Sequence, residues 1–239
     1  MNFNRKTCLK PFTWLEVAAD KAYLCCPGWL NKDIGEYGDD NNIFALWNSD
    51  KSHKIRESIF DGSFKYCNPT ICPRIQTGDL DDIKMILDGH FGEDLQKIFA
   101  EKKVHVDAPT YINLAYDRSC NLQCPSCRNE FIFLKENDHE LKIKEEAFNK
   151  QLLDFIHNNQ KIIRLYITGS GDPFASKLFQ DFIKKIDLTK NPNIEVVLIT
   201  NGVLFDQNHW EQISNIHNCN YIVSDRKPRF LSSAPPCSS

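Results

Sequence analysis

Residues 111–127 read YINLAYDRSCNLQCPSC, an apolar run followed at once by three cysteines within eight residues. The run from Tyr111 to Tyr116 predicts a strand. Cys120, Cys124 and Cys127 then fall on one loop directly after it. A 4Fe-4S cluster is normally held by four cysteines, so three thiolates leave one iron open to a ligand from outside the protein.

Two other interpretations of the three cysteines stay open. A zinc ion could use them with a fourth ligand from elsewhere, or they could be reduced thiols without a ligand. Zinc modules usually pair one C-x-x-C with a second pair of ligands, and no histidine pair stands nearby at ligand spacing. The spacing therefore favours an iron-sulfur site.

Downstream of the loop, strand-like and helix-like segments alternate. This order is typical of parallel strands joined by crossover helices. The Lys- and Glu-rich stretch 135–144 is expected to be a solvated loop. The predicted strands are 164–168, 195–200 and 221–224, and the predicted helices are 145–158, 177–186 and 206–216.

These motifs together resemble the radical SAM enzymes, whose C-x-x-x-C-x-x-C loop follows the first strand of a partial βα barrel. The segment Thr168-Gly-Ser-Gly-Asp-Pro173 is similar to the family's glycine-rich segment, which meets the amino group of S-adenosylmethionine. The segments Thr200-Asn-Gly202 and Val223-Ser-Asp225 are similar to its ligand-facing strand ends. The position before Cys127, often aromatic in the family, is Ser126 here. The cofactor-binding residues that the resemblance implies are Gly169, Ser170, Gly171, Asp172, Thr200, Asn201 and Ser224.

The resemblance implies an enzyme that binds a 4Fe-4S cluster and S-adenosylmethionine. Its reduced cluster would cleave S-adenosylmethionine to a 5'-deoxyadenosyl radical, with electrons from a protein such as a flavodoxin or ferredoxin. The protein's own part would be orientation and the exclusion of water and oxygen. No residue is nominated as a catalytic acid, base or hydrogen donor.

A second group of cysteines lies near the N-terminus. Residues 7–75 contain Cys8, Cys25-Cys-Pro-Gly-Trp29, Leu46-Trp-Asn-Ser49, Ile55-Arg56, Tyr66-Cys67 and Cys72-Pro73. On these residues the stretch resembles the SPASM module, an auxiliary cluster domain known chiefly from radical SAM enzymes that modify peptides and proteins, where it normally follows the barrel. Five cysteines suffice for one cluster and hardly for two. Cys8, Cys67 and Cys72 are the first choices, with Cys25 or Cys26 as the fourth ligand, and a structural four-cysteine zinc site is the alternative. The candidates are Cys8, Cys25, Cys26, Cys67 and Cys72.

The predicted fold class is α/β, a partial (βα) barrel of the radical SAM type, incomplete with about four βα units and preceded by a small cysteine-rich α+β module. The module is expected to contain paired strands at 14–17 and 22–25 and a helix at 49–60 capped by Asn48 or Ser49. The connector is expected to be helical in two pieces. The predicted domains are 1–78 for the auxiliary module, 79–106 for the connector, 107–225 for the radical SAM core and 226–239 for an irregular tail.

An incomplete barrel would expose one edge of a parallel sheet. A partner chain or a dimer mate could cover it. The alternatives are a non-catalytic remnant that still binds clusters, and a zinc-bearing interaction module in which the same cysteines hold structural metal.

The composition excludes several classes of function. A net charge of -3 with 26% charged residues gives no indication of a nucleic-acid partner. No apolar run approaches the length of a membrane span, and residues 1–10 lack the apolar core of a signal peptide. We therefore expect a cytoplasmic protein with no membrane partner, in which thiols stay reduced. Cys219 and Cys237 receive no role.

Overall fold

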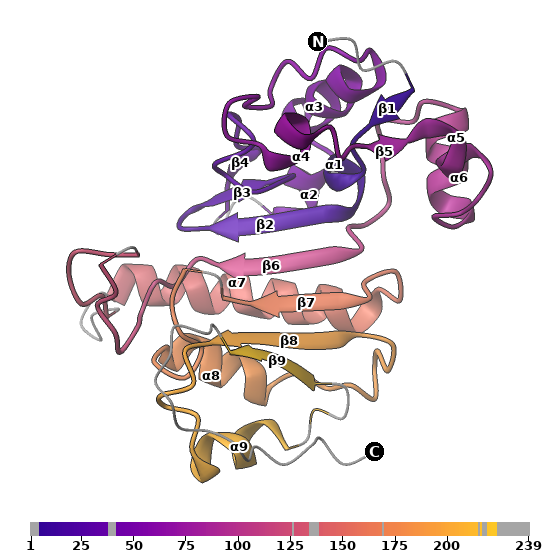
Figure 1. Cartoon of the computed structure of the whole chain (residues 1–239). Helices are drawn as coiled ribbons and strands as arrows, with labels where there is room; N and C mark the ends of the chain where they lie inside the picture. The colour runs from indigo at the N-terminus through magenta and orange to yellow at the C-terminus, as the bar shows by residue number, and fades with distance from the viewer. Residues whose placement is uncertain are drawn as a thin grey trace. The chain divides into compact units, whose positions relative to one another are not determined.

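The computed structural model describes residues 5–37, 42–125, 127–133, 139–168, 170–214, 216 and 219–223. The chain folds into two compact units, Met1–Thr110 and Tyr111–Ser239, which we call unit 1 and unit 2. Figure 1 shows their elements in chain order. Among the described residues, no helix has both the length and the apolar character needed to span a bilayer.

Unit 2 is built on four parallel strands in the order β6, β7, β8, β9. Their bounds are β6 Tyr111–Ala115, β7 Arg164–Ile167, β8 Glu195–Thr200 and β9 Cys219–Val223. Ile112, Leu165 and Val196 stand side by side in this register, and each is fully buried. Because the strands run the same way, the loops that follow β6, β7 and β8 leave from one edge of the sheet (Figure 1).

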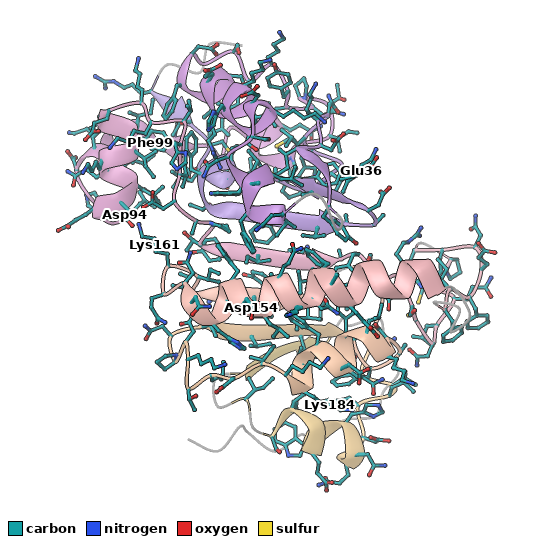
Figure 2. The ribbon with its side chains drawn as sticks, turned by 180° about the vertical axis from the view of Figure 1, so that it is seen from behind. Glu36, Asp94, Phe99, Asp154, Lys161 and Lys184 are labelled. Atoms are coloured by element: carbon teal, nitrogen blue, oxygen red, sulfur yellow. The ribbon has the colours of Figure 1, made fainter. Side chains whose placement is uncertain are left out.

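Three helices connect these strands: α7 His139–Asn158, α8 Lys177–Lys184 and α9 Gln207–Ile213. Figures 1 and 2 show α7 and α8 against the same face of the sheet. Phe148, Leu152 and Ile156 recur every four residues on α7 and are buried. Asp154 and Lys184, labelled in Figure 2, lie on the exposed faces of the two helices.

The predicted alternation of strands and helices in unit 2 is confirmed. Strand 195–200 is found at its predicted bounds, and each other predicted strand overlaps an observed one. The loop prediction for 135–144 was wrong in part, because α7 begins at His139. Lys and Glu are good helix formers, so they extend the helix upstream of its apolar face. The closure of these strands into part of a barrel stays a prediction.

Unit 1 contains short strands and helices packed around an aromatic core. Strands β2, β3 and β4 pair antiparallel in sequence order, and β1 pairs with β5. The strands are β1 Lys6–Thr7, β2 Trp14–Ala18, β3 Lys21–Tyr23, β4 Gly35–Glu36 and β5 Asp81–Asp82. The helices are α1 Lys10–Thr13, α2 Ile43–Trp47, α3 Asp50–Phe60, α4 Pro73–Thr77, α5 Ile83–Leu87 and α6 Glu93–Ala100.

The local predictions for unit 1 are confirmed, except that β3 ends at Tyr23 and not at residue 25 as predicted. Strands β2 and β3 pair, and α3 begins after Ser49, whose side chain accepts a hydrogen bond from the Ser52 backbone N–H. The connector forms two helices, α5 and α6. Phe99 of α6, labelled in Figure 2, packs against Phe12 and Phe60 with ring centroids 5.0 and 5.3 Å away. The connector therefore contributes to the core of unit 1.

Arg56 is a fully buried cation in the middle of unit 1. Burial lowers the pKa of its guanidinium to about 9, so the group is charged at pH 7. Its Nε donates to the Pro11 carbonyl at 2.9 Å, and its Nη1 donates to the Val104 carbonyl at 2.8 Å. The guanidinium also lies 4.4 Å from the centre of the Trp47 ring. Arg56 thus joins the start of the chain, α2 and the segment after α6.

Replacing Arg56 with alanine should lower the free energy of unfolding by about 3 kcal/mol, because the buried Pro11 carbonyl and the half-buried Val104 carbonyl lose a charged donor. Chemical denaturation of the metal-loaded chain measures this loss. Lys54→Ala, on the exposed side of the same helix, is the control and should stay within about 0.5 kcal/mol of the parent chain. An equal effect of both variants would contradict the structural role of Arg56.

Candidate metal centre

The three cysteines of unit 2 lie on the loop that follows β6. The loop opens with Asp117, which is 1% exposed. One carboxylate oxygen of Asp117 accepts from the Ser119 backbone N–H at 2.8 Å, and the other accepts from the Ser176 hydroxyl. Ser176 is the N-cap of α8. The start of the cysteine loop is therefore fixed to the helix that follows β7.

The cysteines themselves sit on a tight turn. The backbone N–H groups of Cys127 and Arg128 both donate to the Cys124 carbonyl, at 2.8 and 3.0 Å. The Cys120 N–H donates to the Ile132 carbonyl at 2.9 Å. Cys120 is buried, Cys124 is half-buried and Cys127 is exposed. The exposure of the three cysteines therefore increases along the loop, from Cys120 to Cys127.

The segment after β7 packs against this loop. Thr168 has a left-handed backbone conformation, with φ 58°, and its hydroxyl accepts from the backbone N–H of Gly171 at 2.9 Å. The Ser170 hydroxyl donates to the Ala115 carbonyl at 2.8 Å. The Asp172 N–H donates to the Ser119 carbonyl at 2.8 Å. Thr168 and residues 170–172, which we call the 168–172 segment, are held in this way against both β6 and the cysteine loop.

Gly171 sits where no side chain fits. A Cβ atom on Gly171 would lie 2.5 Å from the Ser119 carbonyl oxygen and 3.0 Å from the Asp117 carbonyl oxygen. Both contacts are with backbone, which cannot move aside as a flexible side chain would. The absence of a side chain is therefore what lets the two segments touch.

The segment after β8 completes the site through Asp172. This carboxylate is fully buried and accepts from the Thr200 hydroxyl at 2.7 Å and from the Asn201 N–H at 2.8 Å. The Asn201 side-chain amide donates to the Cys120 sulfur at 3.6 Å and to the Asn121 side chain at 2.8 Å. By holding the Asn201 backbone, Asp172 positions the Asn201 side-chain amide to donate to the Cys120 sulfur.

By residue type, the donor set suits a cluster held by thiolates. Such clusters are held by cysteine and tuned by hydrogen bonds to the sulfurs. Here the Asn201 amide donates to Cys120, and the Arg128 guanidinium lies 3.7 Å from the Cys127 sulfur. Within the ranges that the structure describes, no group of three or more His, Cys, Asp or Glu residues is arranged to hold a metal ion.

The structure brings most of the sequence-predicted residues of unit 2 together. Ser170, Gly171, Asp172, Thr200 and Asn201 all lie on segments that meet the cysteine loop. Gly169 and Ser224 lie outside the described residues, as does the predicted tail 226–239.

Sequence reasoning missed four further residues that hold this site: Asp117, Asn121, Arg128 and Ser176. The only local signals were that Asp117 comes directly after a predicted strand and that Arg128 directly follows a cysteine. Neither signal identifies a partner in another loop.

In unit 1, the thiols of four of the five cysteines lie near enough to interact electrostatically in pairs. The Cys8 thiol interacts electrostatically with those of Cys25, Cys67 and Cys72, and Cys67 interacts with Cys25 and Cys72. Cys26 takes part through its backbone, with an N–H that hydrogen-bonds to the Cys25 thiol. The Cys26 carbonyl accepts from Trp29 and Leu30 in the turn that follows.

The four thiols come from four different segments of unit 1. Cys8 follows β1, and Cys25 follows β3. Cys67 forms an isolated bridge with Leu30, and Cys72 is the N-cap of α4. The fold of unit 1 thus brings together cysteines that are up to 64 positions apart in the sequence.

Two cationic side chains interact with these thiols. Arg74 of α4 donates to the Cys8 sulfur at 3.9 Å and forms an ion pair with Asp81 at 3.0 Å. The charge of Lys10 acts on Cys25 and Cys8, while burial lowers the pKa of its ammonium group. Burial also raises the pKa of the Cys8 and Cys25 thiols, and that of Cys67 to about 12. Metal binding at these thiols would release protons, because the thiolate is the ligand.

Comparison with known protein families gives one result. A family model described as a 4Fe-4S single cluster domain matches residues 110–231, just over half of the chain. The matched region contains the cysteine loop and excludes the cysteines of unit 1. No curated protein and no solved structure matches the chain.

Proposed function

The chain belongs to the 4Fe-4S single cluster domain family, and on this premise we propose that it is a radical SAM enzyme. Cys120, Cys124 and Cys127 would hold the cluster, and three protein ligands would leave one iron open to S-adenosylmethionine. When bound and reduced, the cluster supplies the electron that cleaves S-adenosylmethionine and yields the 5'-deoxyadenosyl radical. The chain's own residues hold the two groups in position.

One observation carries the proposal: three loops from the same sheet edge converge on the cysteines. The 168–172 segment touches the cysteine loop at Gly171, and the 200–202 segment reaches Cys120 through Asn201. Ligands of parallel βα folds bind at the carboxyl ends of the strands. A ligand on the open iron would meet these segments.

The chain's residues have separate tasks in this site. Gly171 allows close approach of backbone segments, and the Thr168 hydroxyl orients the Ser170 and Gly171 N–H groups. Asp172 acts as a positioning residue, because its oxygens are occupied by Thr200, Asn201 and the Phe174 N–H. Asn201 donates to the cluster ligand Cys120.

We also propose that unit 1 holds a second 4Fe-4S cluster, bound by Cys8, Cys25, Cys67 and Cys72. Pairwise electrostatic interactions connect Cys25 with Cys8 and Cys67, and both of these with Cys72, which supports this ligand set with Cys25 as its fourth thiol. An auxiliary cluster of this kind favours a peptide or protein as substrate. A flavodoxin-like or ferredoxin-like protein would supply the electrons.

The experiment that tests the function is release of 5'-deoxyadenosine from S-adenosylmethionine. The reconstituted full chain is reduced with dithionite under anaerobic conditions, and nucleoside and methionine are quantified by chromatography. Equimolar release of both products supports the proposal. Cluster-loaded protein that binds S-adenosylmethionine but releases neither would leave only a cluster-binding protein.

The choice of Cys25 gives a direct prediction. Cys25→Ala should lose about four irons per chain, because a cluster normally needs its fourth thiolate. Cys26→Ala, the adjacent and matched control, should keep the full iron content. Iron and sulfide assays after identical reconstitution measure both. The opposite pattern would assign the fourth ligand to Cys26.

A further inference from the structure

Arg128 is a buried guanidinium at the junction of two loops in unit 2. Arg128 directly follows Cys127 in the sequence and is 7% exposed. The Nη1 group donates to the Arg118 carbonyl at 2.7 Å, and the Nη2 group donates to the Ser170 carbonyl at 2.6 Å. Nη2 also lies 3.7 Å from the Cys127 sulfur.

These contacts join three parts of the site. Arg118 lies at the start of the cysteine loop, Cys127 near its end, and Ser170 in the segment after β7. A planar guanidinium can bridge several acceptors at once in fixed geometry, which a lysine ammonium on a flexible chain does poorly. Arg128 therefore fixes the distance between the cysteine turn and the 168–172 segment.

The same two segments already touch on another side. The Asp172 N–H donates to the Ser119 carbonyl at 2.8 Å, and Gly171 leaves no room for a Cβ atom. The contacts of Gly171 prevent closer approach of the segments, and the hydrogen bonds of Arg128 prevent their separation. The Ser170 carbonyl is held between these two constraints.

The charge of Arg128 has a second consequence. A positive group beside a cluster sulfur stabilises the form of the cluster that carries one more electron. The hydrogen bonds described for this guanidinium go to neutral carbonyls and to the Cys127 sulfur, so its charge acts on the thiolate.

We propose that Arg128 is a positioning residue for the cluster and its ligand: it holds the 168–172 segment at the cysteine turn and favours the reduced cluster. This inference rests on the proposed function. It separates two effects of one side chain, since bridging requires the guanidinium shape and the redox effect requires only its charge.

The test compares Arg128→Lys and Arg128→Met in the reconstituted full chain. EPR-monitored redox titration gives the midpoint potential, and the signal that changes on addition of S-adenosylmethionine identifies the cluster of unit 2. Titration of that change gives the dissociation constant. Arg164→Met is the control, because Arg164 begins β7 at the far end of the strand, pairs with Glu195 and is 42% exposed.

Arg128→Met should shift the ratio of reduced to oxidised cluster at least tenfold toward the oxidised form at fixed potential, equivalent to about 59 mV for a one-electron couple. It should also weaken S-adenosylmethionine binding at least tenfold. In Arg128→Lys, the ratio of reduced to oxidised cluster at fixed potential should stay within about threefold of the parent value. Its S-adenosylmethionine binding should weaken at least tenfold, as in Arg128→Met. Arg164→Met should change neither quantity.

Parent-like potential and binding in both Arg128 variants would overturn the inference and leave the proposed function intact. If Arg128→Met does not load iron, the test uses Arg128→Lys alone. Parent-like binding of S-adenosylmethionine in Arg128→Lys would then overturn the bridging role. A parent chain that loads a cluster but shows no spectral change with S-adenosylmethionine overturns the proposed function and the inference with it.

Discussion

Cys124→Ala should lose about four irons per chain and all release of 5'-deoxyadenosine. Cys124 is the middle ligand of the loop, and its carbonyl accepts both N–H groups of the turn that carries Cys127. Removing its thiolate leaves two of three protein ligands, too few for a cluster that normally has four. Iron and sulfide assays together with product chromatography measure both losses.

The control for this variant is Cys26→Ala, which removes a thiol that lies outside the proposed ligand set. It should keep both the iron content and the product. Iron held by unit 1 should also persist in Cys124→Ala, at about four per chain. Product release from Cys124→Ala at the parent rate would remove Cys124 from the site.

Gly171→Ala should separate the 168–172 segment from the cysteine loop. The new methyl group would meet the Ser119 carbonyl oxygen at 2.5 Å, so one of the two backbones must move. Overpacking of this kind typically costs about 1–3 kcal/mol. We expect S-adenosylmethionine affinity to fall at least tenfold, equivalent to about 1.4 kcal/mol, with the iron content unchanged.

Gly28→Ala is the matched control, because a Cβ atom there meets nothing within 4 Å. EPR titration with S-adenosylmethionine measures the affinity, and chemical denaturation measures the stability. Parent-like affinity in Gly171→Ala would mean that the close approach of these segments does not shape the ligand site.

The elements of the fold were predictable because their signals are local. Apolar runs mark β6, β7 and β8, and a serine cap with an apolar face marks α3. The start of α7 was not predicted from hydrophobic spacing, since the buried series Phe148, Leu152 and Ile156 begins well after His139. The Lys and Glu residues of this stretch have high helix propensity, which favours the earlier start.

The candidate site was only partly predictable, because its supporting contacts are distant in sequence. The Arg128 contact with Ser170 spans 42 positions, and the Asn201 contact with Cys120 spans 81. Cys25 and Cys26 are neighbours in sequence, and only the fold distinguishes their surroundings. Residue types and spacing therefore indicated which chemistry to expect, and tertiary contacts indicated which side chains support it.

The most direct test of the account is the content of iron, sulfide and zinc per chain after anaerobic purification and reconstitution. We predict about eight irons and about eight sulfides, which corresponds to one four-iron cluster in each unit. About four of each would limit the account to one cluster. Stoichiometric zinc without iron would contradict it, because the cysteines would then hold structural metal.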